Sequence, residues 1–225
     1  IGNDFQISLA LKYGTLPQIY SLNVKSELDQ VKLMLRSYYT TYIKEEIQAE
    51  AITRNIGAFQ RFINVAAQFN ANIIEYSNIA QGCSVPASTV REYFIILEDT
   101  LIGSFLWPFA HSERKKSRPK FYFFDCGVLH GIQNRLSDPP SSEEQGFLFE
   151  TWFFNELIRI RDYNHKEISI SFWRQKDNEI DFLIEDHSGP KLAIECKSGK
   201  GNFNYTSIRA FKRNFPKVPV IIASL

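Results

Sequence analysis

Three charged side chains near the C-terminal end of the chain have the types and spacing of a metal-dependent hydrolytic site. Glu195 and Lys197 are two residues apart in an apolar stretch, so on a β-strand they would share one face. Asp181 precedes them by one hairpin. Two carboxylates and a backbone carbonyl, here that of Cys196, form the hard-oxygen site that Mg²⁺ or Mn²⁺ prefers. A lysine beside such a site can orient or deprotonate a water molecule, so this group predicts phosphodiester cleavage.

Glu150 is a fourth candidate for this site. It lies among apolar residues in the stretch Phe149-Glu150-Thr151-Trp152. A carboxylate on an apolar stripe is costly unless it has a partner, and a metal ion or a lysine would provide one. The alternative is an ordinary hairpin with salt-bridging charges, because Glu and Lys separated by one residue are common.

The elements that would position these residues follow one another in the last third of the chain. Hydrophobic periodicity predicts a helix, three strands, a basic amphipathic helix and a further strand, at 147–161, 168–173, 179–185, 191–197, 205–214 and 218–223. The last strand is apolar throughout, which favours a central place in the sheet. If Asp186 pairs with Lys191, Asp181 lies opposite Cys196. It then joins the face of Glu195 only through a register change of one residue or a bulge.

The preceding region is mostly helical. Residues 1–25 read as a loop, and Ser26 with Asp29 resembles a capping box at the start of a helix. A second helix is expected at about 55–69. Two shorter helices at 77–82 and 89–99 enclose a tight turn, and two apolar stretches, 101–106 and 120–124, follow them.

Helix, turn, helix and two strands are typical of a winged helix, which would contact DNA at two places. The second helix exposes Ser88 and Arg91, and the loop between the strands is the basic run Arg114–Lys120. Within that run, Arg114, Lys115 and Lys116 would form the wing. A solvated loop is the alternative interpretation of these charges.

Composition limits the function classes. The chain of 225 residues is 44% hydrophobic and has a formal net charge of +1, so nucleic-acid binding has to come from local clusters. No apolar run is long enough to span a membrane. The three cysteines, Cys83, Cys126 and Cys196, form no CxxC pair, which predicts free thiols in a reducing cytoplasm.

Asp181, Glu195 and Lys197 resemble the PD-(D/E)xK motif of restriction-endonuclease-like nucleases, with Ile180 in place of the proline and Cys196 in place of the usual aliphatic residue. The wider chain resembles the C-terminal part of prokaryotic predicted AAA-type ATPases, which carry an uncharacterised nuclease-like domain. This similarity rests on Gly14-Thr15-Leu16-Pro17, residues 42–47, 89–99, 119–128 and 146–150, and Glu179-Ile180-Asp181-Phe182.

The resemblance implies an upstream nucleotide-binding module that this chain lacks, since no GxxxxGK[ST] loop occurs in it. ATP would bind only in that module, and a homo-oligomer would form through it. The resemblance also implies that Asp181, Glu195 and Lys197 are metal-site residues and that Glu150 is the helix acid.

We therefore expect an α+β protein with three parts. Residues 1–25 would be a linker from the absent module, 26–140 a helical winged-helix domain, and 141–225 a restriction-endonuclease-like αβββαβ domain. The expected function is Mg²⁺-dependent cleavage of DNA. The alternatives are a catalytically inactive DNA-docking module and a regulatory or assembly region that couples the ATPase to a protein partner.

Overall fold

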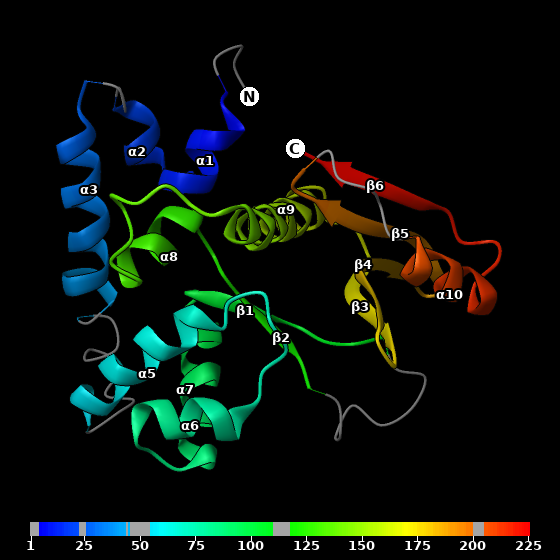
Figure 1. Ribbon diagram of the computed structural model, residues 1–225, viewed down its shortest axis with the longest axis horizontal. Coiled ribbons are helices and arrows are strands. Elements are labelled where there is room, and N and C mark those ends of the chain that lie inside the picture. Colours follow the sequence, from blue (N-terminus) through cyan, green and yellow to red (C-terminus); the bar gives the residue numbers. More distant parts are fainter. Residues whose placement is uncertain (1–4, 23–25, 44, 46–54, 110–117, 200–204) are drawn as a thin grey trace. The chain divides into compact units, whose positions relative to one another are not determined.

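The computed structural model describes residues 5–22, 26–43, 45, 55–109, 118–199 and 205–225, with mixed helices and strands (Figure 1). The chain divides into two compact units. The first comprises Ile1–Phe105 and Phe121–Pro140, and the second comprises Leu106–Lys120 and Ser141–Leu225. The second unit is therefore built from two separate stretches of sequence.

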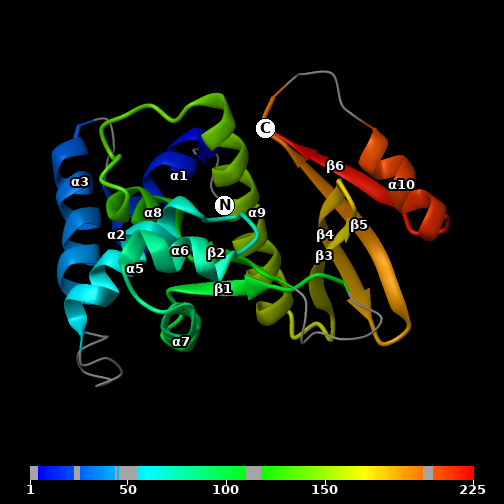
Figure 2. The ribbon, with the colours of Figure 1, turned by 60° about the horizontal axis from the view of Figure 1, so that its bottom comes forward.

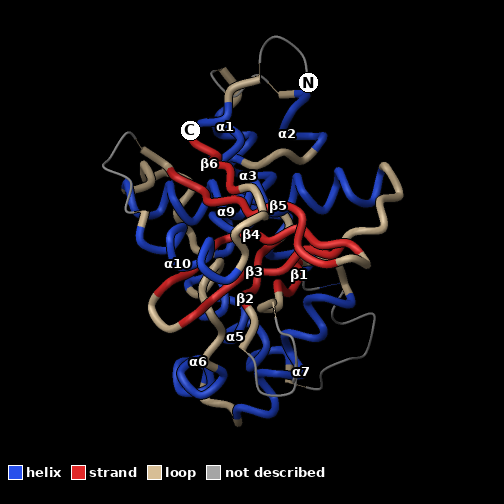
Figure 3. The backbone as a smooth tube through the Cα atoms, turned by 90° about the vertical axis from the view of Figure 1, so that its right-hand side faces the viewer, coloured by secondary structure: helices blue, strands red, loops and turns tan. Residues whose placement is uncertain are grey.

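The second unit holds a four-stranded mixed sheet (red in Figure 3). Its elements are α9 (Ser142–Tyr163), β3 (Ser169–Gln175), β4 (Asn178–Asp186), β5 (Gly189–Lys197), α10 (Thr206–Asn214) and β6 (Val220–Ser224). The strand order is β3-β4-β5-β6, with β5 and β6 parallel and the other pairs antiparallel. The expected αβββαβ order is confirmed. The expected central position of the last strand is wrong, because β6 is an outer strand of the sheet.

The two helices of this unit cover opposite faces of the sheet (Figure 2). On one face, the ring of Phe182 stacks on Phe153 and Phe154 of α9, with centroids 5.9 Å apart in both cases. On the other face, Phe211 of α10 is fully buried in a cluster with Trp173 and Ile180. The apolar sides of both helices are therefore used in packing.

The helix α9 begins earlier than expected. Ser141 Oγ accepts a hydrogen bond from Glu144 N, and Glu144 Oε2 accepts one from Ser141 N, which is a complete capping box. The residues between the expected domain start at 141 and the expected helix start at 147 are therefore helical from Ser142 onward.

The segment Trp107–Phe109, which follows β1 (Gly103–Leu106) in the sequence, pairs with the outer edge of β3. Phe109 N donates to Phe172 O at 2.6 Å, and Phe172 N donates to Trp107 O at 3.1 Å, around a bridge between Pro108 and Phe172. The edge of β3 is thus paired rather than open.

In the first unit, the region expected to be a loop contains helices. They are α1 (Ile7–Tyr13) and α2 (Pro17–Ser21), followed by α3 (Leu28–Ser37), the π-helix η1 (Tyr38–Ile43) and α5 (Ile56–Gln68). Ala10, Leu11 and Tyr13 are buried. The capping role expected for Ser26 is wrong, because α3 starts after Glu27 and no side-chain bond caps it.

Asp125 fixes the arrangement of α1 and α8 (Cys126–Ile132). Its Oδ1 accepts from Gly127 N and Val128 N at 2.8 and 3.0 Å, which caps α8. Its Oδ2 accepts from Thr15 N at 2.6 Å. Gly14 has a φ of +80°, and a Cβ there would lie 2.0 Å from Asp125 Oδ1. The segments 14–17 and 125–127 therefore contact each other and have a structural role.

The helix pair expected in this unit is present as α6 (Tyr76–Cys83) and α7 (Ala87–Asp99), joined through Ser84 in the left-handed conformation. Val90, Phe94 and Leu97 are buried, as expected. The strands β1 (Gly103–Leu106) and β2 (Lys120–Phe123) form a two-stranded sheet after the helices.

Two expectations from composition can be compared with the structure. All three cysteines are unpaired thiols. Among the helices in the described ranges, none has the length and apolar character needed to cross a membrane.

Candidate active site in the second unit

The β4–β5 hairpin brings Asp181 beside Glu195. Phe182 pairs with Ile194 and Leu183 with Ala193, which is one residue away from the register expected from the turn. Asp181 consequently lies at the level of Glu195 rather than opposite Cys196, and its Oδ2 accepts a hydrogen bond from Cys196 N at 2.7 Å. The register change that would bring Asp181 and Glu195 together is thus present.

A bulge adjoins Asp181 on its other side. Ser171 pairs with Leu183 and Trp173 with Ile180, so Phe172 of β3 spans the two residues Asp181 and Phe182 of β4. Bulges of this kind re-aim a side chain and are frequent next to active sites.

The carboxylates in this cluster perturb one another. Burial raises the pKa of Asp181 well above its usual value, and the nearby charges of Glu150 and Glu195 raise it further. Lys120 and the Cys196 N–H oppose this shift without cancelling it. Burial likewise raises the pKa of Glu195, against the opposing effect of Lys197. Burial and the neighbouring carboxylates therefore favour the protonated form of Asp181 over its charged form.

Glu195 has one engaged and one unengaged carboxylate oxygen. Its Oε1 accepts from Lys197 Nζ at 2.5 Å, whereas its Oε2 is buried without a hydrogen-bond partner in the described part of the chain. The Glu195 residue is 8% exposed. A buried carboxylate oxygen with no partner is costly, so this atom favours a cationic ligand.

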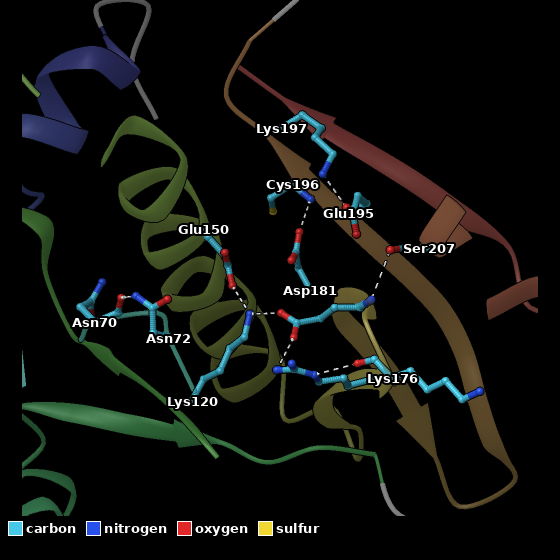
Figure 4. A network of polar contacts seen from close by, with 12 residues as sticks. Asn70, Asn72, Lys120, Glu150, Lys176, Asp181, Glu195, Cys196, Lys197 and Ser207 are labelled. Atoms are coloured by element: carbon cyan, nitrogen blue, oxygen red, sulfur yellow. Dashed lines mark hydrogen bonds and ion pairs between the residues drawn. The ribbon is translucent and has the colours of Figure 1, made fainter. Parts of the chain in front are cut away.

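Lys120 is a member of this cluster that the sequence did not reveal (Figure 4). Its Nζ lies 2.9 Å from Glu150 Oε1, 2.6 Å from Glu179 Oε1 and 5.6 Å from the centre of the Phe172 ring. The residue is 4% exposed, so its assignment to a solvated basic loop is wrong. Burial alone would lower the pKa of Lys120, but Glu150, Glu179 and Asp181 together raise it. Lys120 therefore stays charged.

One sequence signal could have identified Lys120. It is the first residue of the apolar stretch Lys120-Phe121-Tyr122-Phe123, which forms β2 and is buried throughout. A lysine at the start of a fully apolar strand needs an acidic partner as much as Glu150 does on its helix.

The donor chemistry of the cluster fits a divalent cation. Four acidic side chains, Glu150, Glu179, Asp181 and Glu195, share the space with two lysines, Lys120 and Lys197. Within the described ranges, no three His, Cys, Asp or Glu side chains converge closely enough to hold one metal ion. The expected metal site uses only two acidic side chains, Asp181 and Glu195, because its third ligand is the backbone carbonyl of Cys196.

The residues expected to bind nucleic acid are separate from this cluster in sequence. Ser88 and Arg91 are exposed on α7, and the Arg91 guanidinium lies 5.0 Å from the centre of the Tyr76 ring. Arg114, Lys115 and Lys116 lie outside the described residues.

Comparison with known families finds two matches. A family described as "Domain of unknown function (DUF8612)" matches residues 5–138, and one described as "Domain of unknown function (DUF4143)" matches residues 145–223. The second domain is known in AAA-ATPase-associated proteins. No curated protein and no solved structure matches the chain.

Proposed function

This chain belongs to the DUF8612 family, and from its second match, to DUF4143, and from the acidic cluster we propose that it is the DNA-cleaving C-terminal part of an AAA-type ATPase. The observation that carries the proposal is that Asp181, Glu195 and Lys197 lie in one cluster, in which Glu195 Oε2 is buried and has no hydrogen-bond partner among the described residues. The element order α9-β3-β4-β5-α10-β6 supports a restriction-endonuclease-like domain, for which this order is expected.

In this proposal Asp181, Glu195 and the Cys196 carbonyl hold Mg²⁺ or Mn²⁺, with Glu150 close by. When bound, the metal ion supplies Lewis-acid stabilisation of charge on the phosphate oxygens and activates water. The protein contributes the rest. The Cys196 N–H orients the Asp181 carboxylate through its 2.7 Å hydrogen bond. Lys197 keeps a proton at Nζ beside Glu195 Oε1, where it can hold a phosphate oxygen or orient water. Lys120 holds Glu150 in place.

The direct test is nicking of supercoiled plasmid by the purified chain. We expect Mg²⁺ or Mn²⁺ to support nicking and a chelator to stop it, because in this proposal the metal ion stabilises the charge on the phosphate oxygens and activates the attacking water. Absence of nicking, with metal binding demonstrated by calorimetry, would instead favour a DNA-docking module that does not cleave.

A second candidate function, DNA docking without cleavage, is favoured by the first unit. There α6 and α7 form a helix–turn–helix whose second helix exposes Ser88 and Arg91, and β1 and β2 follow it as the strands of a winged helix would. Binding of DNA by this unit would be compatible with either an active or an inactive second unit.

The wing can be tested by charge removal. Replacing Arg114, Lys115 and Lys116 with Ala should weaken DNA binding and flatten its salt dependence by up to about three units of log–log slope, roughly one for each lost phosphate contact. The measurement is fluorescence anisotropy of labelled duplex over a range of NaCl concentrations. An unaltered slope would mean that this loop is only solvated. If the unaltered protein binds no DNA at all, the regulatory or assembly role remains.

A further inference from the structure

The helix α10 has one apolar and one basic side. Phe211 is fully buried against the sheet, and Ile208 and Phe215 pack around it. Arg209 and Arg213, one helical turn apart, are both exposed on the other side. The packing of α10 thus leaves an arginine pair facing solvent.

The last thirty residues of the sequence, which include α10, carry positive charges only. From Cys196 to the last residue the sequence contains no Asp or Glu, although the chain as a whole is almost neutral at +1. Its cations are Lys197, Lys200, Arg209, Lys212, Arg213 and Lys217. Lys212 is engaged, because its Nζ donates to Val218 O at 2.6 Å. Within the described part of the chain, Arg209, Arg213 and Lys217 form no ion pair and are exposed.

The helix α10 lies at the same end of the sheet as the acidic cluster, on the face opposite to α9. Asn214 Nδ2, at the end of α10, donates to Gln175 Oε1 next to the β3–β4 turn at 3.1 Å. Nearer the start of the helix, Ser207 Oγ accepts from Glu179 N at 3.3 Å (Figure 4). The side chain of Glu179 in turn binds Lys120. Two exposed cations lie beside Asp177 here: Lys176 in the β3–β4 turn, and Arg174 near the end of β3, whose Nη1 is 3.7 Å from Glu179 Oε2.

We propose that α10 and the β3–β4 turn form a binding surface for the phosphate backbone of duplex DNA, centred on Arg209 and Arg213. The inference rests on the proposed function, because it names the surface that would bring the substrate to the acidic cluster. Guanidinium groups suit this role, since their fork of N–H donors matches phosphate oxygens.

A lipid surface fits α10 less well than a polyanion does. A helix that lies on a membrane inserts its apolar side among the acyl chains. The apolar side of α10 is already packed on Trp173 and Ile180. What remains exposed on the helix is its charged side, and charge complementarity therefore favours a nucleic-acid backbone.

The test compares two double variants of the full chain. Arg209→Gln with Arg213→Gln removes two charges from the proposed surface. Lys166→Gln with Lys191→Gln removes two exposed charges from the same unit at the opposite end of the sheet, where Asp186 and Gly189 pair beside the β4–β5 turn. Circular dichroism would verify that both variants are folded, as expected for exposed positions.

Binding to labelled duplex is measured by anisotropy in EDTA, so that no cleavage can occur. Loss of two phosphate contacts should reduce the salt-dependence slope by about 0.9 each, hence roughly 1.8 in total, and the control should leave it unchanged. The proposal is overturned if the arginine variant keeps the full slope, if the control loses as much, or if the unaltered protein binds phosphatidylserine vesicles but no duplex.

The same variants separate this inference from the proposed function. Duplex binding that depends on Arg209 and Arg213, without plasmid nicking in Mn²⁺, would support the surface and contradict the nuclease. Nicking that is unaffected by both arginine substitutions would support the nuclease and contradict the surface.

Discussion

Lys197→Ala should bind Mn²⁺ as well as the unaltered protein, or more tightly, and yet nick plasmid roughly 10²–10⁴-fold more slowly, the usual effect of losing a positioned acid–base group. The lysine is no metal ligand, and its loss removes a positive charge 2.5 Å from Glu195 Oε1. Its side chain is 36% exposed, so its amine can reach substrate. Calorimetry with Mn²⁺ and a nicking assay on the same preparations would measure both properties.

Two further variants make the comparison specific. Asp181→Ala should lose metal binding and nicking together, because Asp181 is proposed to hold the ion. Lys191→Ala is a matched control, since Lys191 also lies on β5 and pairs with an acid, Asp186, at 3.4 Å. It should leave nicking unchanged. Full nicking by Lys197→Ala would show that this lysine is only a salt-bridge partner of Glu195.

Without metal, the Asp181→Asn variant should be more stable than the unaltered protein, and with metal it should be less stable. The raised pKa of Asp181 means that the folded state keeps a proton that the unfolded state has released above about pH 3.9. The stability of metal-free protein therefore falls as the pH rises from there toward the raised pKa. Asn carries no charge and can still accept from Cys196 N, so without metal the variant should be the more stable protein at neutral pH.

With metal the order should invert. A ligand bound only by the folded state stabilises it by about 2.7 kcal/mol at a concentration one hundred times its Kd, and the variant should gain none of this. Thermal melts of both proteins in EDTA and in Mn²⁺ would measure the effect. Asp186→Asn is the control, because Asp186 lies at the other end of the hairpin, hydrogen bonds from Ser188 lower its pKa, and metal should stabilise this variant normally. Equal Mn²⁺ shifts in the unaltered and Asp181→Asn proteins would contradict an assembled site.

The elements of the second unit could be predicted from sequence because their periodicity is local. Alternation along 179–185 and 191–197 indicated two strands, and the turn between them indicated a hairpin. The register was one residue off because it depends on an irregularity between Ile184 and Glu185, which no local pattern encodes. The edge position of β6 was missed for a similar reason, since an apolar run indicates burial but not the place of a strand in the sheet.

Lys120 was missed because its partners are distant in sequence. Glu150 and Glu179 reach it only through the fold, whereas its neighbours Arg114–Arg118 made it look like part of a solvated run. The helices α1 and α2 were missed because they are short, at 7 and 5 residues, and because Gly14 ends α1 and Pro17 is the first residue of α2, two residue types that normally indicate interruptions. Such helices depend on tertiary contacts such as the Asp125–Thr15 bond.

The discontinuous second unit has a consequence for how this protein can be divided or recombined. A fragment starting at Ser141 would contain the whole αβββαβ sequence, yet it would lack Trp107–Phe109, which pair with the edge of β3, and Lys120, which neutralises Glu150. Its sheet would gain an exposed, aggregation-prone edge, and its acidic cluster would lose a buried counter-charge. The region that matches DUF4143 is therefore not a complete folding unit by itself. A chimera that takes this unit from another member of the family would have to include 106–120 as well as 141–225.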